Sequence, residues 1–400
     1  MFRYLCVNVL GPVFSRSFQP FGVFVKRRHL LRLGAAAPVC LAFPKLATAA
    51  STKIVLGQSA AFSGPASALG ERFKEGALLA FDRVNARGGV NGRTIELRSM
   101  DDGYEPERCA ENTQKLLREN VFTLFGYVGT PTSLAALPLA TTAGVPFFAP
   151  FSGAEALRKP FNRHAFHVRA SYFDETAEIV EQITSIGLKR IGVFYQNDSY
   201  GKTGLDGVTA ALKSRNLAVT GQGTVERNTV NVDAAVQAIL AEKPDTIVQI
   251  SAYKSCAAFI RAARKAGFNG GFYNVSFVGT QALAAELGRD ARGVVISQVM
   301  PLPFSATAPV SADYLAAGKA LGEKFEPNYG GIEGFVAART LIEGLRHAGN
   351  NPTPDTLVTA LENMRELNLG GFFIDFTAQS HAGSKYVDMT ILTAEGKVRH

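Results

Sequence analysis

The sequence predicts an α/β protein with two doubly wound parallel sheets. Short runs rich in β-branched or aromatic residues alternate with amphipathic stretches, so the hydrophobic period switches repeatedly between that of a strand and that of a helix. The alternation restarts after residues 165–169. Because strands that alternate with helices form βαβ units, each of the two runs predicts one parallel sheet with helices on both faces.

The first run of alternation predicts seven elements before the restart. In chain order these are a strand at 53–60, a helix at 71–86, a strand at 94–102, a helix at 107–119, a strand at 121–128, a helix at 132–143 and a strand at 145–151.

The second run predicts a further set of strands and helices in the same alternation. Helices are expected at 176–186, 204–215, 232–241 and 254–266, and strands at 190–196, 219–225, 245–251, 272–277 and 293–299. Residues 311–361 then indicate three helices, and 371–375 and 385–392 indicate closing strands.

Residues 1–49 are typical of an export signal. They contain seven Lys or Arg and no acid, and a run at 26–32 with paired arginines precedes a weakly apolar stretch. Small residues of the A-x-A type follow at Ala47-Thr48-Ala49. The arginine pair resembles a twin-arginine signal, with the general export route as the alternative, and we expect cleavage near Ala49 and a periplasmic product.

The charge distribution argues against a nucleic-acid-binding protein. The net charge is +8, but the seven leader cations account for nearly all of it, so the remaining chain is almost neutral and lacks a concentrated basic face. The chain also lacks an uncharged apolar run of the length that an ordinary membrane span needs.

Two cysteines follow the leader, Cys109 and Cys256. Each has the helical spacing of a buried stripe, with Leu116 near the first and Phe259 near the second. A disulfide between them is one alternative in an oxidising compartment.

Several motifs together resemble the Leu/Ile/Val-binding family of periplasmic substrate-binding proteins, which have the type I periplasmic-binding fold and serve ABC importers. They are Phe62-Ser63-Gly64-Pro65, residues 84–93 (VNARGGVNGR), Asp101-Asp102, residues 126–130 (GYVGT), Gly144-Val145-Pro146, residues 197–201 (NDSYG), Tyr253 and Glu333-Gly334-Phe335. Their order and spacing cover essentially the whole chain after the leader.

This resemblance implies two lobes joined by three hinge crossovers, near Ala170, Pro301 and Gln379. Lobe 1 would comprise 51–170 plus 302–378, and lobe 2 would comprise 171–301 plus 379–400. The two cysteines would then fall in different lobes, where a disulfide would hinder closure, so we expect reduced thiols. The ligand would lie between the lobes, at the carboxyl ends of the strands.

A helix start near Thr130 provides a site for a carboxylate without any cation. Thr130 suits the N-cap position and Pro131 the first helical position, and a helix start offers free N–H groups and a positive dipole end. Ordinary capping is the alternative reading. In the family, this turn and the one at Phe151-Ser152-Gly153 clamp the ligand carboxylate, the matching positions being Thr130, Phe151 and Gly153.

The resemblance assigns further ligand contacts to lobe 2 and to the cleft walls. Tyr200 matches an aromatic that closes over the ligand, and Tyr253 matches a tyrosine hydroxyl. Leu69 makes one pocket wall aliphatic where the family archetype has an aromatic residue. Tyr172 is a further candidate just after the first crossover.

Ser276 occupies the position of the acid that normally receives the ligand's α-ammonium. A neutral hydroxyl stabilises a cation far less than a carboxylate does, so we expect an organic or aromatic acid rather than a ligand that depends on an ammonium. Glu333 could supply the missing charge from the hinge side, and a helix N-cap carboxylate is its alternative role.

We expect no enzyme, cofactor or metal centre. Ser251-Ala252-Tyr253-Lys254 and Lys202-Thr203-Gly204 match penicillin-recognising serine enzymes only in letters, because their order is reversed and no S-D-N lies between them. The adjacent Asp101 and Asp102 should point to opposite faces of a strand end.

The expected protein is therefore a monomeric binding protein that captures a small carboxylate-bearing solute and passes it to an ABC importer permease. The alternative is an extracytoplasmic ligand sensor that signals to a membrane partner. No transmembrane or kinase segment precedes the last residue, His400, which favours transport.

Overall fold

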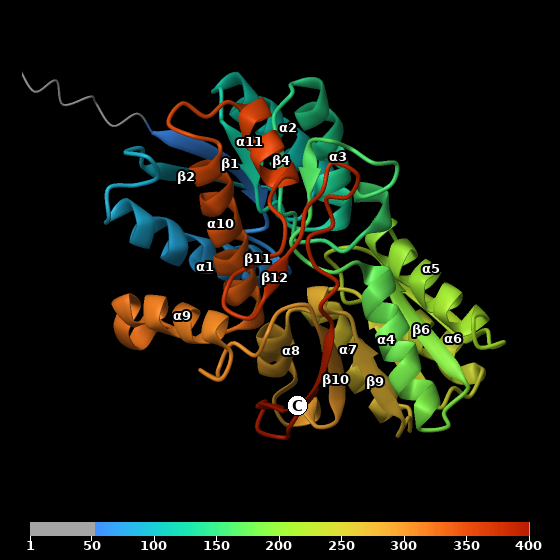
Figure 1. The fold of residues 1–400 in the computed structure, drawn as a ribbon. Coiled ribbons are helices and arrows are strands. Elements are labelled where there is room, and N and C mark those ends of the chain that lie inside the picture. Colours follow the sequence, from blue (N-terminus) through green and yellow to red (C-terminus); the bar gives the residue numbers. More distant parts are fainter. Residues whose placement is uncertain (1–52, 400) are drawn as a thin grey trace, which may run out of the picture. The chain divides into compact units, whose positions relative to one another are not determined.

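The computed structural model describes residues 53–399, so the predicted export signal lies outside the described residues. A first sheet of five parallel strands has the order β2-β1-β3-β4-β5, the strand order of a doubly wound fold (Figure 1). Its strands are β1 (Ile54–Ala60), β2 (Ile95–Asp101), β3 (Thr123–Phe125), β4 (Phe147–Phe148) and β5 (Ala165–Phe166).

Helices cover both faces of this sheet. The connection from β1 to β2 runs in the opposite direction across the sheet to those from β2 to β5, so right-handed crossovers place their helices on opposite faces. Accordingly α1 packs along α10 and α2 along α3. The helices are α1 (Ser67–Asn85), α2 (Pro106–Arg118), α3 (Thr130–Thr142), α9 (Pro309–Gly318), α10 (Tyr329–His347) and α11 (Pro354–Glu362).

The second sheet repeats the same winding. Five parallel strands follow the order β7-β6-β8-β9-β10, and β13 and β14 extend the sheet antiparallel beside β10. The strands are β6 (Ile191–Gln196), β7 (Val219–Val225), β8 (Thr246–Ile250), β9 (Gly271–Asn274), β10 (Val294–Gln298), β13 (Asp388–Leu392) and β14 (Val398–Arg399). The central strand β8 is buried throughout, whereas the edge strand β7 is partly exposed.

Five helices accompany the second sheet: α4 (Tyr172–Ser185), α5 (Ser199–Lys213), α6 (Asp233–Ala241), α7 (Tyr253–Lys265) and α8 (Thr280–Leu287). We call the first sheet with its helices lobe 1 and the second with its helices lobe 2. The chain passes between them three times, from β5 to α4, from β10 to α9, and from a small β11–β12 hairpin (Leu367–Asn368 and Phe373–Ile374) to β13. The protein thus has the expected fold of two doubly wound lobes joined by three crossovers.

Four local expectations differ from the structure. The strand predicted at 272–277 ends at Asn274, and Ser276 begins a short 3₁₀ turn, Ser276–Val278. The helix α8 was not predicted. The segment 371–375 pairs in the hairpin rather than in either large sheet. Thr130 is the first residue of α3 rather than its N-cap, a position held by Gly129.

Gly129 explains the start of α3. Its φ is 98°, a conformation that favours glycine, and a Cβ there would lie 2.1 Å from a ring carbon of Tyr104. The backbone therefore turns sharply into the helix at a residue with no side chain. The N-cap position does not need the Thr130 hydroxyl.

Both lobes have apolar cores, and the two cysteines belong to them. Cys109 and Cys256 are fully buried free thiols. Burial raises the pKa of the Cys256 thiol and, together with Asp102, that of Cys109, so both stay protonated.

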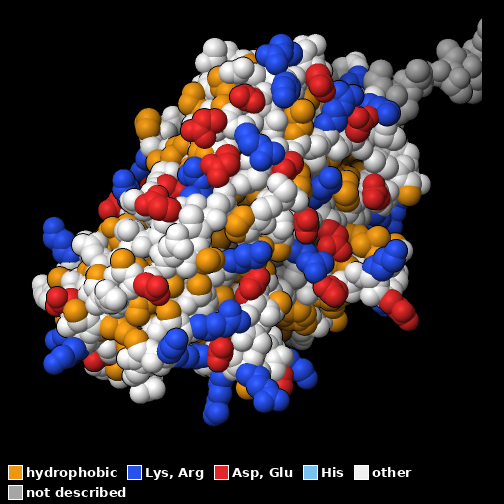
Figure 2. All heavy atoms as spheres, turned by 180° about the vertical axis from the view of Figure 1, so that it is seen from behind, with side chains coloured by type: hydrophobic (Ala, Val, Ile, Leu, Met, Phe, Trp, Pro, Cys, Tyr) orange, Lys and Arg blue, Asp and Glu red, His pale blue; other side chains and the backbone are white. Residues whose placement is uncertain are grey.

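The surface carries both signs of charge. On the face turned away in Figure 1, Lys and Arg side chains are interspersed with Asp and Glu (Figure 2). Among the described residues, no helix is long and apolar enough to cross a membrane.

Candidate ligand-binding site

A pocket of about 400 Å³ lies between the two lobes. Lobe 1 contributes the starts of α1 and α10 and the turn after β4, and lobe 2 contributes the starts of α7 and α8. Two crossover segments, at Arg169 and at residues 298–300, complete the wall. The pocket is therefore built from both lobes and opens to solvent beside exposed residues such as Ala285 and Glu326.

Five of the ten predicted site residues line this pocket: Leu69, Phe151, Tyr253, Ser276 and Glu333. They come from five separate segments of the chain, from α1 to α10, which the fold brings together. Leu69, Phe151 and Met300 form an apolar middle section.

The other five, Thr130, Ser152, Gly153, Tyr172 and Tyr200, do not line the pocket. Thr130 and Ser152 are fully buried, and their hydroxyls lie 2.8 Å apart in a mutual hydrogen bond. The rings of Tyr172 and Tyr200 pack together at 5.3 Å. Tyr172 N–H also donates to the Gly153 carbonyl at 2.7 Å, so this pair connects the start of α4 in lobe 2 to the turn after β4 in lobe 1.

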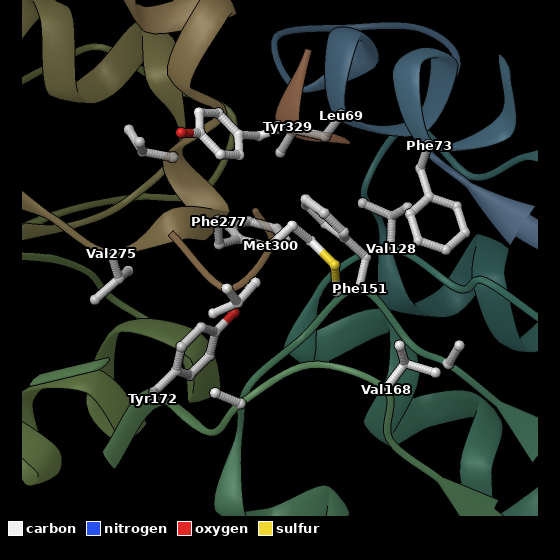
Figure 3. Close-up of a cluster of buried hydrophobic side chains, with 14 of the residues drawn as sticks. Leu69, Phe73, Val128, Phe151, Val168, Tyr172, Val275, Phe277, Met300 and Tyr329 are labelled. Carbon is white, nitrogen blue, oxygen red and sulfur yellow. The ribbon is translucent and has the colours of Figure 1, made fainter. Parts of the chain in front are cut away.

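Phe277 is the residue that fills the space beside them (Figure 3). Its ring lies 5.5 Å from that of Phe151 in lobe 1 and 4.6 Å from that of Tyr200 in lobe 2, with Tyr104 at 5.9 Å. Nothing in the motif pattern marked Phe277, because a single aromatic after a strand is ordinary core. Its position leaves the open volume on the side of α8 and α10.

Arg169, in the first crossover, was missed by the sequence analysis and dominates the inner end of the pocket. It is 1% exposed, and its guanidinium lies 4.6 Å from the centre of the Phe151 ring. Nε lies 3.2 Å from Oε1 of Glu333, and Nη2 donates to the Ser276 hydroxyl. Burial lowers the pKa of Arg169, but the carboxylates of Glu333 and Glu175 raise it more, so it stays charged.

Ser276 links Arg169 to a second buried acid, Glu175. Its hydroxyl donates to Oε1 of Glu175 at 3.0 Å, and its backbone N–H donates to Oε2 at 2.7 Å. The Ser297 hydroxyl also donates to Oε2, at 2.6 Å. Burial raises the pKa of Glu175, whereas Arg169 and these hydrogen bonds lower it. The Ser276 hydroxyl therefore donates its hydrogen bond to Glu175, and its oxygen accepts one from Arg169 and fixes the position of that side chain.

Glu333 faces the pocket from α10. Burial raises its pKa to about 7, against the lowering effect of Arg169, and the negative charge of Glu175 adds to the increase. The N-cap role weighed for Glu333 is wrong, because Asn328 caps α10 by accepting a hydrogen bond from Gly331 N–H. Its carboxylate is the partner of Arg169.

Tyr253 closes the pocket towards α1. Burial raises the pKa of its hydroxyl, and hydrogen bonds to the Ala68 backbone and the Ser67 side chain oppose that shift. The hydroxyl thus joins lobe 2 to lobe 1. At the outer rim Arg72 pairs with Glu326 at 2.6 Å.

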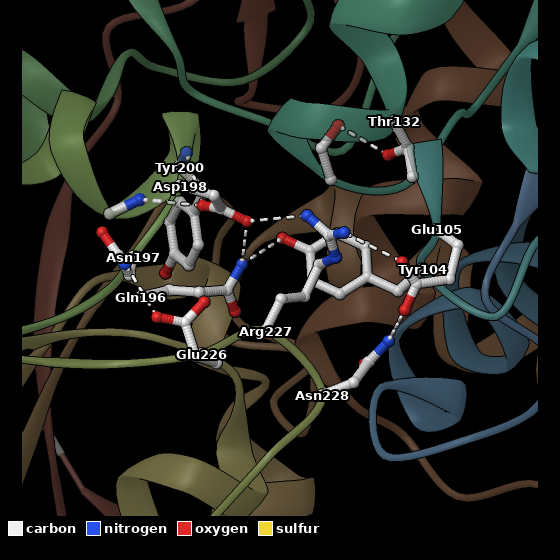
Figure 4. A network of polar contacts seen from close by, with 12 residues as sticks. Tyr104, Glu105, Thr132, Gln196, Asn197, Asp198, Tyr200, Glu226, Arg227 and Asn228 are labelled. Atoms are coloured by element: carbon white, nitrogen blue, oxygen red, sulfur yellow. Dashed lines mark hydrogen bonds and ion pairs between the residues drawn. The ribbon is translucent and has the colours of Figure 1, made fainter. Parts of the chain in front are cut away.

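A second polar network joins the lobes away from the pocket (Figure 4). Arg227 of lobe 2 pairs with Glu105 of lobe 1 at 2.8 Å. Asn228 donates to Oε1 of Glu105 at 2.7 Å and to the Gly103 carbonyl at 3.0 Å. We call Glu105, Arg227 and Asn228 the interlobe latch.

Comparison with known proteins agrees with this architecture. A sequence model of the family described as periplasmic binding protein matches residues 53–397. The chain belongs to this family. "Leu/Ile/Val-binding protein homolog 7" of Brucella suis is 25% identical over 341 residues, which cover 80% of this chain and 82% of that protein. The predicted likeness to the Leu/Ile/Val-binding family is confirmed.

Solved structures of periplasmic binding proteins share the fold. "A possible leucine/isoleucine/valine-binding protein" from Rhodopirellula baltica is 33% identical with a TM-score of 0.84, covering 87% of this chain and 96% of that one. A "substrate-binding periplasmic protein" from Ralstonia solanacearum is also 33% identical, with a TM-score of 0.82 and coverage of 86% and 99%. The family consists of substrate-binding proteins, which implies a periplasmic location, a small-molecule ligand and a membrane transporter as partner.

Proposed function

We propose that this periplasmic binding protein captures a small carboxylate-bearing solute in the interlobe pocket and delivers it, unchanged, to the permease of an ABC importer. Residues 1–49 act as its export signal in this proposal. Lobe closure is the capture step, because the pocket walls come from both lobes.

The observation that carries the proposal is a buried guanidinium that lines the interlobe pocket. Arg169 has no hydrogen-bond partner at Nη1 among the described residues, although that atom is inaccessible to solvent. An unpaired buried donor costs roughly 1–3 kcal/mol, and a carboxylate would pair with it in a charge-assisted hydrogen bond. The apolar middle section would hold the body of the solute.

A ligand screen tests the function. The protein is stripped of ligand by refolding and its melting temperature is recorded with aliphatic, aromatic and amino-acid carboxylates and with matching amides. We expect stabilisation by carboxylates and none by the amides, since a ligand at a hundredfold its Kd stabilises by about 2.7 kcal/mol. Mass spectrometry should then recover the bound compound unchanged; a converted product would contradict the proposal.

Filling the pocket should abolish binding without unfolding the protein. Ala282 lines the pocket and is only partly buried, so Ala282→Phe would place a ring in the cavity. We expect at least a hundredfold loss of affinity in calorimetry, because the ring would occupy space that the solute needs. Ala316→Phe, at an exposed position of α9, is the matched control and should bind normally. Normal binding by Ala282→Phe would place the site elsewhere.

A further inference from the structure

The unpaired polar groups of the pocket can all donate hydrogen bonds, and one of them, the Tyr329 hydroxyl, can also accept. Among the described residues that line it, the buried side-chain atoms without a hydrogen-bond partner are Nη1 of Arg169, Nε2 of Gln281, the hydroxyl of Tyr329, and Nε of Arg169, which has only its ion pair with Glu333. The Gln281 amide is oriented by its Oε1, which accepts a hydrogen bond from Tyr329 N–H, so Nε2 is the free donor. These unpaired donors therefore favour a ligand that carries oxygen acceptors.

Two neutral acceptors of the pocket, Ser276 and Gln298, are already engaged. The Ser276 oxygen accepts from Arg169, and Oε1 of Gln298 accepts from Thr280. An ammonium has three donors to satisfy, and the buried carboxylate that lines the pocket, Glu333, is already shared with Arg169. The other lining carboxylates are Glu326, which pairs with Arg72, and the partly exposed Glu286. The hydrogen-bonding pattern thus favours a ligand without an ammonium group.

The charges at the inner end of the pocket set a further condition for the binding of a carboxylate. The inner end contains one cation, Arg169, and two acids, Glu333 and Glu175, and both acids are buried. A ligand carboxylate would bring a third negative charge into this cluster, and like charges held together in a dry site repel strongly. One of the three carboxyl groups must become neutral for the anion to bind well.

We propose that the solute is an organic acid without an ammonium group, whose carboxylate pairs with Nη1 of Arg169 while Glu333 takes up one proton from solvent. This assignment rests on the proposed function. The anion enters, one solvent proton binds a Glu333 oxygen, and the net charge of the cluster is unchanged. A second oxygen of the solute, a keto or hydroxyl group, accepts from Gln281 or Tyr329.

Glu333 is the group placed to take the proton. Glu175 accepts three hydrogen bonds, which stabilise its charged form. Glu333 has the pKa of about 7 already described, so the protonation of Glu333 costs little free energy at neutral pH. The groups that face Glu333 are Arg169 from the first crossover and Glu175 from α4. The other charged groups that line the pocket are Arg72, Glu326, Lys254 and Glu286.

Calorimetry with matched ligand pairs tests the ligand class. Each pair keeps one carbon skeleton and exchanges an ammonium for a carbonyl: leucine with 4-methyl-2-oxopentanoate, phenylalanine with phenylpyruvate, and alanine with pyruvate. We expect the oxo acid of at least one pair to bind at least about tenfold more tightly than its amino acid, a difference of about 1.4 kcal/mol. Tighter binding by the amino acids would overturn the inference and leave the proposed function standing. No binding by any carboxylate would overturn both.

The pH dependence tests the proton uptake. With Glu333 as acceptor, oxo-acid affinity should be constant below about pH 7 and fall by up to about tenfold per pH unit above it, until the pKa of Glu333 in the complex is reached. Binding at about pH 8 in two buffers of different ionisation enthalpy should show uptake of about one proton. Affinity that rises with pH, or binding without proton exchange, contradicts the proposal.

Glu333→Gln supplies the matched variant, because glutamine imitates the protonated acid. We expect up to about tenfold tighter oxo-acid binding than in the wild type at about pH 8, and a flat pH profile. Glu343→Gln, on the same helix but outside the pocket lining, should keep the wild-type profile. If Glu333→Gln instead abolished binding while its melting curve stayed cooperative, the glutamate charge would be needed, as for an ammonium-bearing ligand. The wild-type pH profile decides the matter if Glu333→Gln does not fold.

Discussion

Asp101 and Asp102 are adjacent in the chain and lie in opposite environments at the end of β2. Asp101 is partly exposed; it accepts hydrogen bonds from the N–H groups of Phe62 and Ser63 and pairs with Arg108. Burial raises the pKa of Asp101, but hydrogen bonds from the Ser63 hydroxyl, from the N–H groups of Phe62 and Gly103 and from Arg108 lower it to about 2. Asp102 is fully buried, and burial raises its pKa to about 6 even though Ser59 donates to it.

These two carboxyl groups should give the protein opposite pH effects on stability. Since the pKa of Asp102 is raised on folding from 3.8 to about 6, the unfolded chain loses this proton first, and stability falls by roughly 3 kcal/mol as pH rises between those values. Asp101 contributes stability above its unfolded pKa of 3.8, and that contribution is lost as pH falls towards about 2.

Urea unfolding of wild type and Asp102→Asn between about pH 4 and about pH 7 measures the first effect. The difference between the two proteins should shift by roughly 3 kcal/mol across this range. Asp101→Asn is the control, because its titration lies below the range. A constant difference for Asp102→Asn would show that the Asp102 carboxyl keeps an ordinary pKa.

At the same scale, part of the candidate site could be predicted from the sequence. Five residues that the family resemblance placed at the site line the pocket: Leu69, Phe151, Tyr253, Ser276 and Glu333. Arg169 lies in a crossover without periodic pattern, where a lone arginine normally indicates solvent exposure. Its importance depends on contacts with α10 and the turn after β9, which no local pattern shows.

The elements that position the pocket are α1 and α10, which cross through glycines. A Cβ on Gly76 of α1 would lie 1.7 Å from the carbonyl oxygen of Gly331, and one on Gly334 of α10 would lie 1.9 Å from that of Phe73. The backbones therefore touch. This contact sets the distance between Leu69 and Glu333, which line the pocket from the two helices.

Adding one methyl group at this crossing should disturb both stability and binding. We expect Gly76→Ala or Gly334→Ala to lower the free energy of unfolding by about 1–3 kcal/mol, because neither backbone can move without repacking the core. Ligand affinity should fall as well. Gly330→Ala, on the same helix, would meet nothing closer than 3.4 Å and should keep the stability of the wild type. Equal stability of all three variants in urea unfolding would refute this account.

Strands and helices were predicted correctly where the hydrophobic pattern repeats over many residues. The prediction failed for short elements whose formation depends on contacts with distant parts of the chain. The alternation identified the strands and longer helices of both sheets. The eight-residue α8 follows a strand that was predicted to run too far, and its start depends on Gly279, whose φ of 79° ends the 3₁₀ turn. The β11–β12 hairpin has two residues per strand, too few for any period to appear.

At the scale of the whole molecule, lobe 1 and lobe 2 meet both at the latch and beside the pocket. Tyr253 meets the start of α1 beside the pocket, while Arg227 and Asn228 meet Glu105 at a separate place. Such contacts could not be predicted from the sequence, because each depends on side chains from different lobes. The resemblance supplied the crossovers and the two lobes, but not which surfaces meet.

The latch should set how often the protein is closed before a solute arrives. Exposed ion pairs contribute about 0.2–1 kcal/mol, and a hydrogen bond to a charged group contributes about 1.5–3 kcal/mol. If closed molecules bind the solute, the apparent Kd is the intrinsic Kd divided by the closed fraction. Weakening the latch should therefore weaken binding without changing any group that touches the solute.

Glu105→Gln tests this directly, because it removes the charge that Arg227 faces across the lobes and keeps the side chain's size. We expect a Kd two- to tenfold higher than that of the wild type, with the dissociation rate changing more than the association rate. Solution scattering of the ligand-free variant should give a larger radius of gyration than that of the wild type. The control is Glu226→Gln, whose carboxylate accepts from Asn197 within lobe 2 and joins no lobes. A Kd for Glu105→Gln equal to that of Glu226→Gln would mean that closure is governed by the pocket and the crossovers, and that the latch follows closure rather than favouring it.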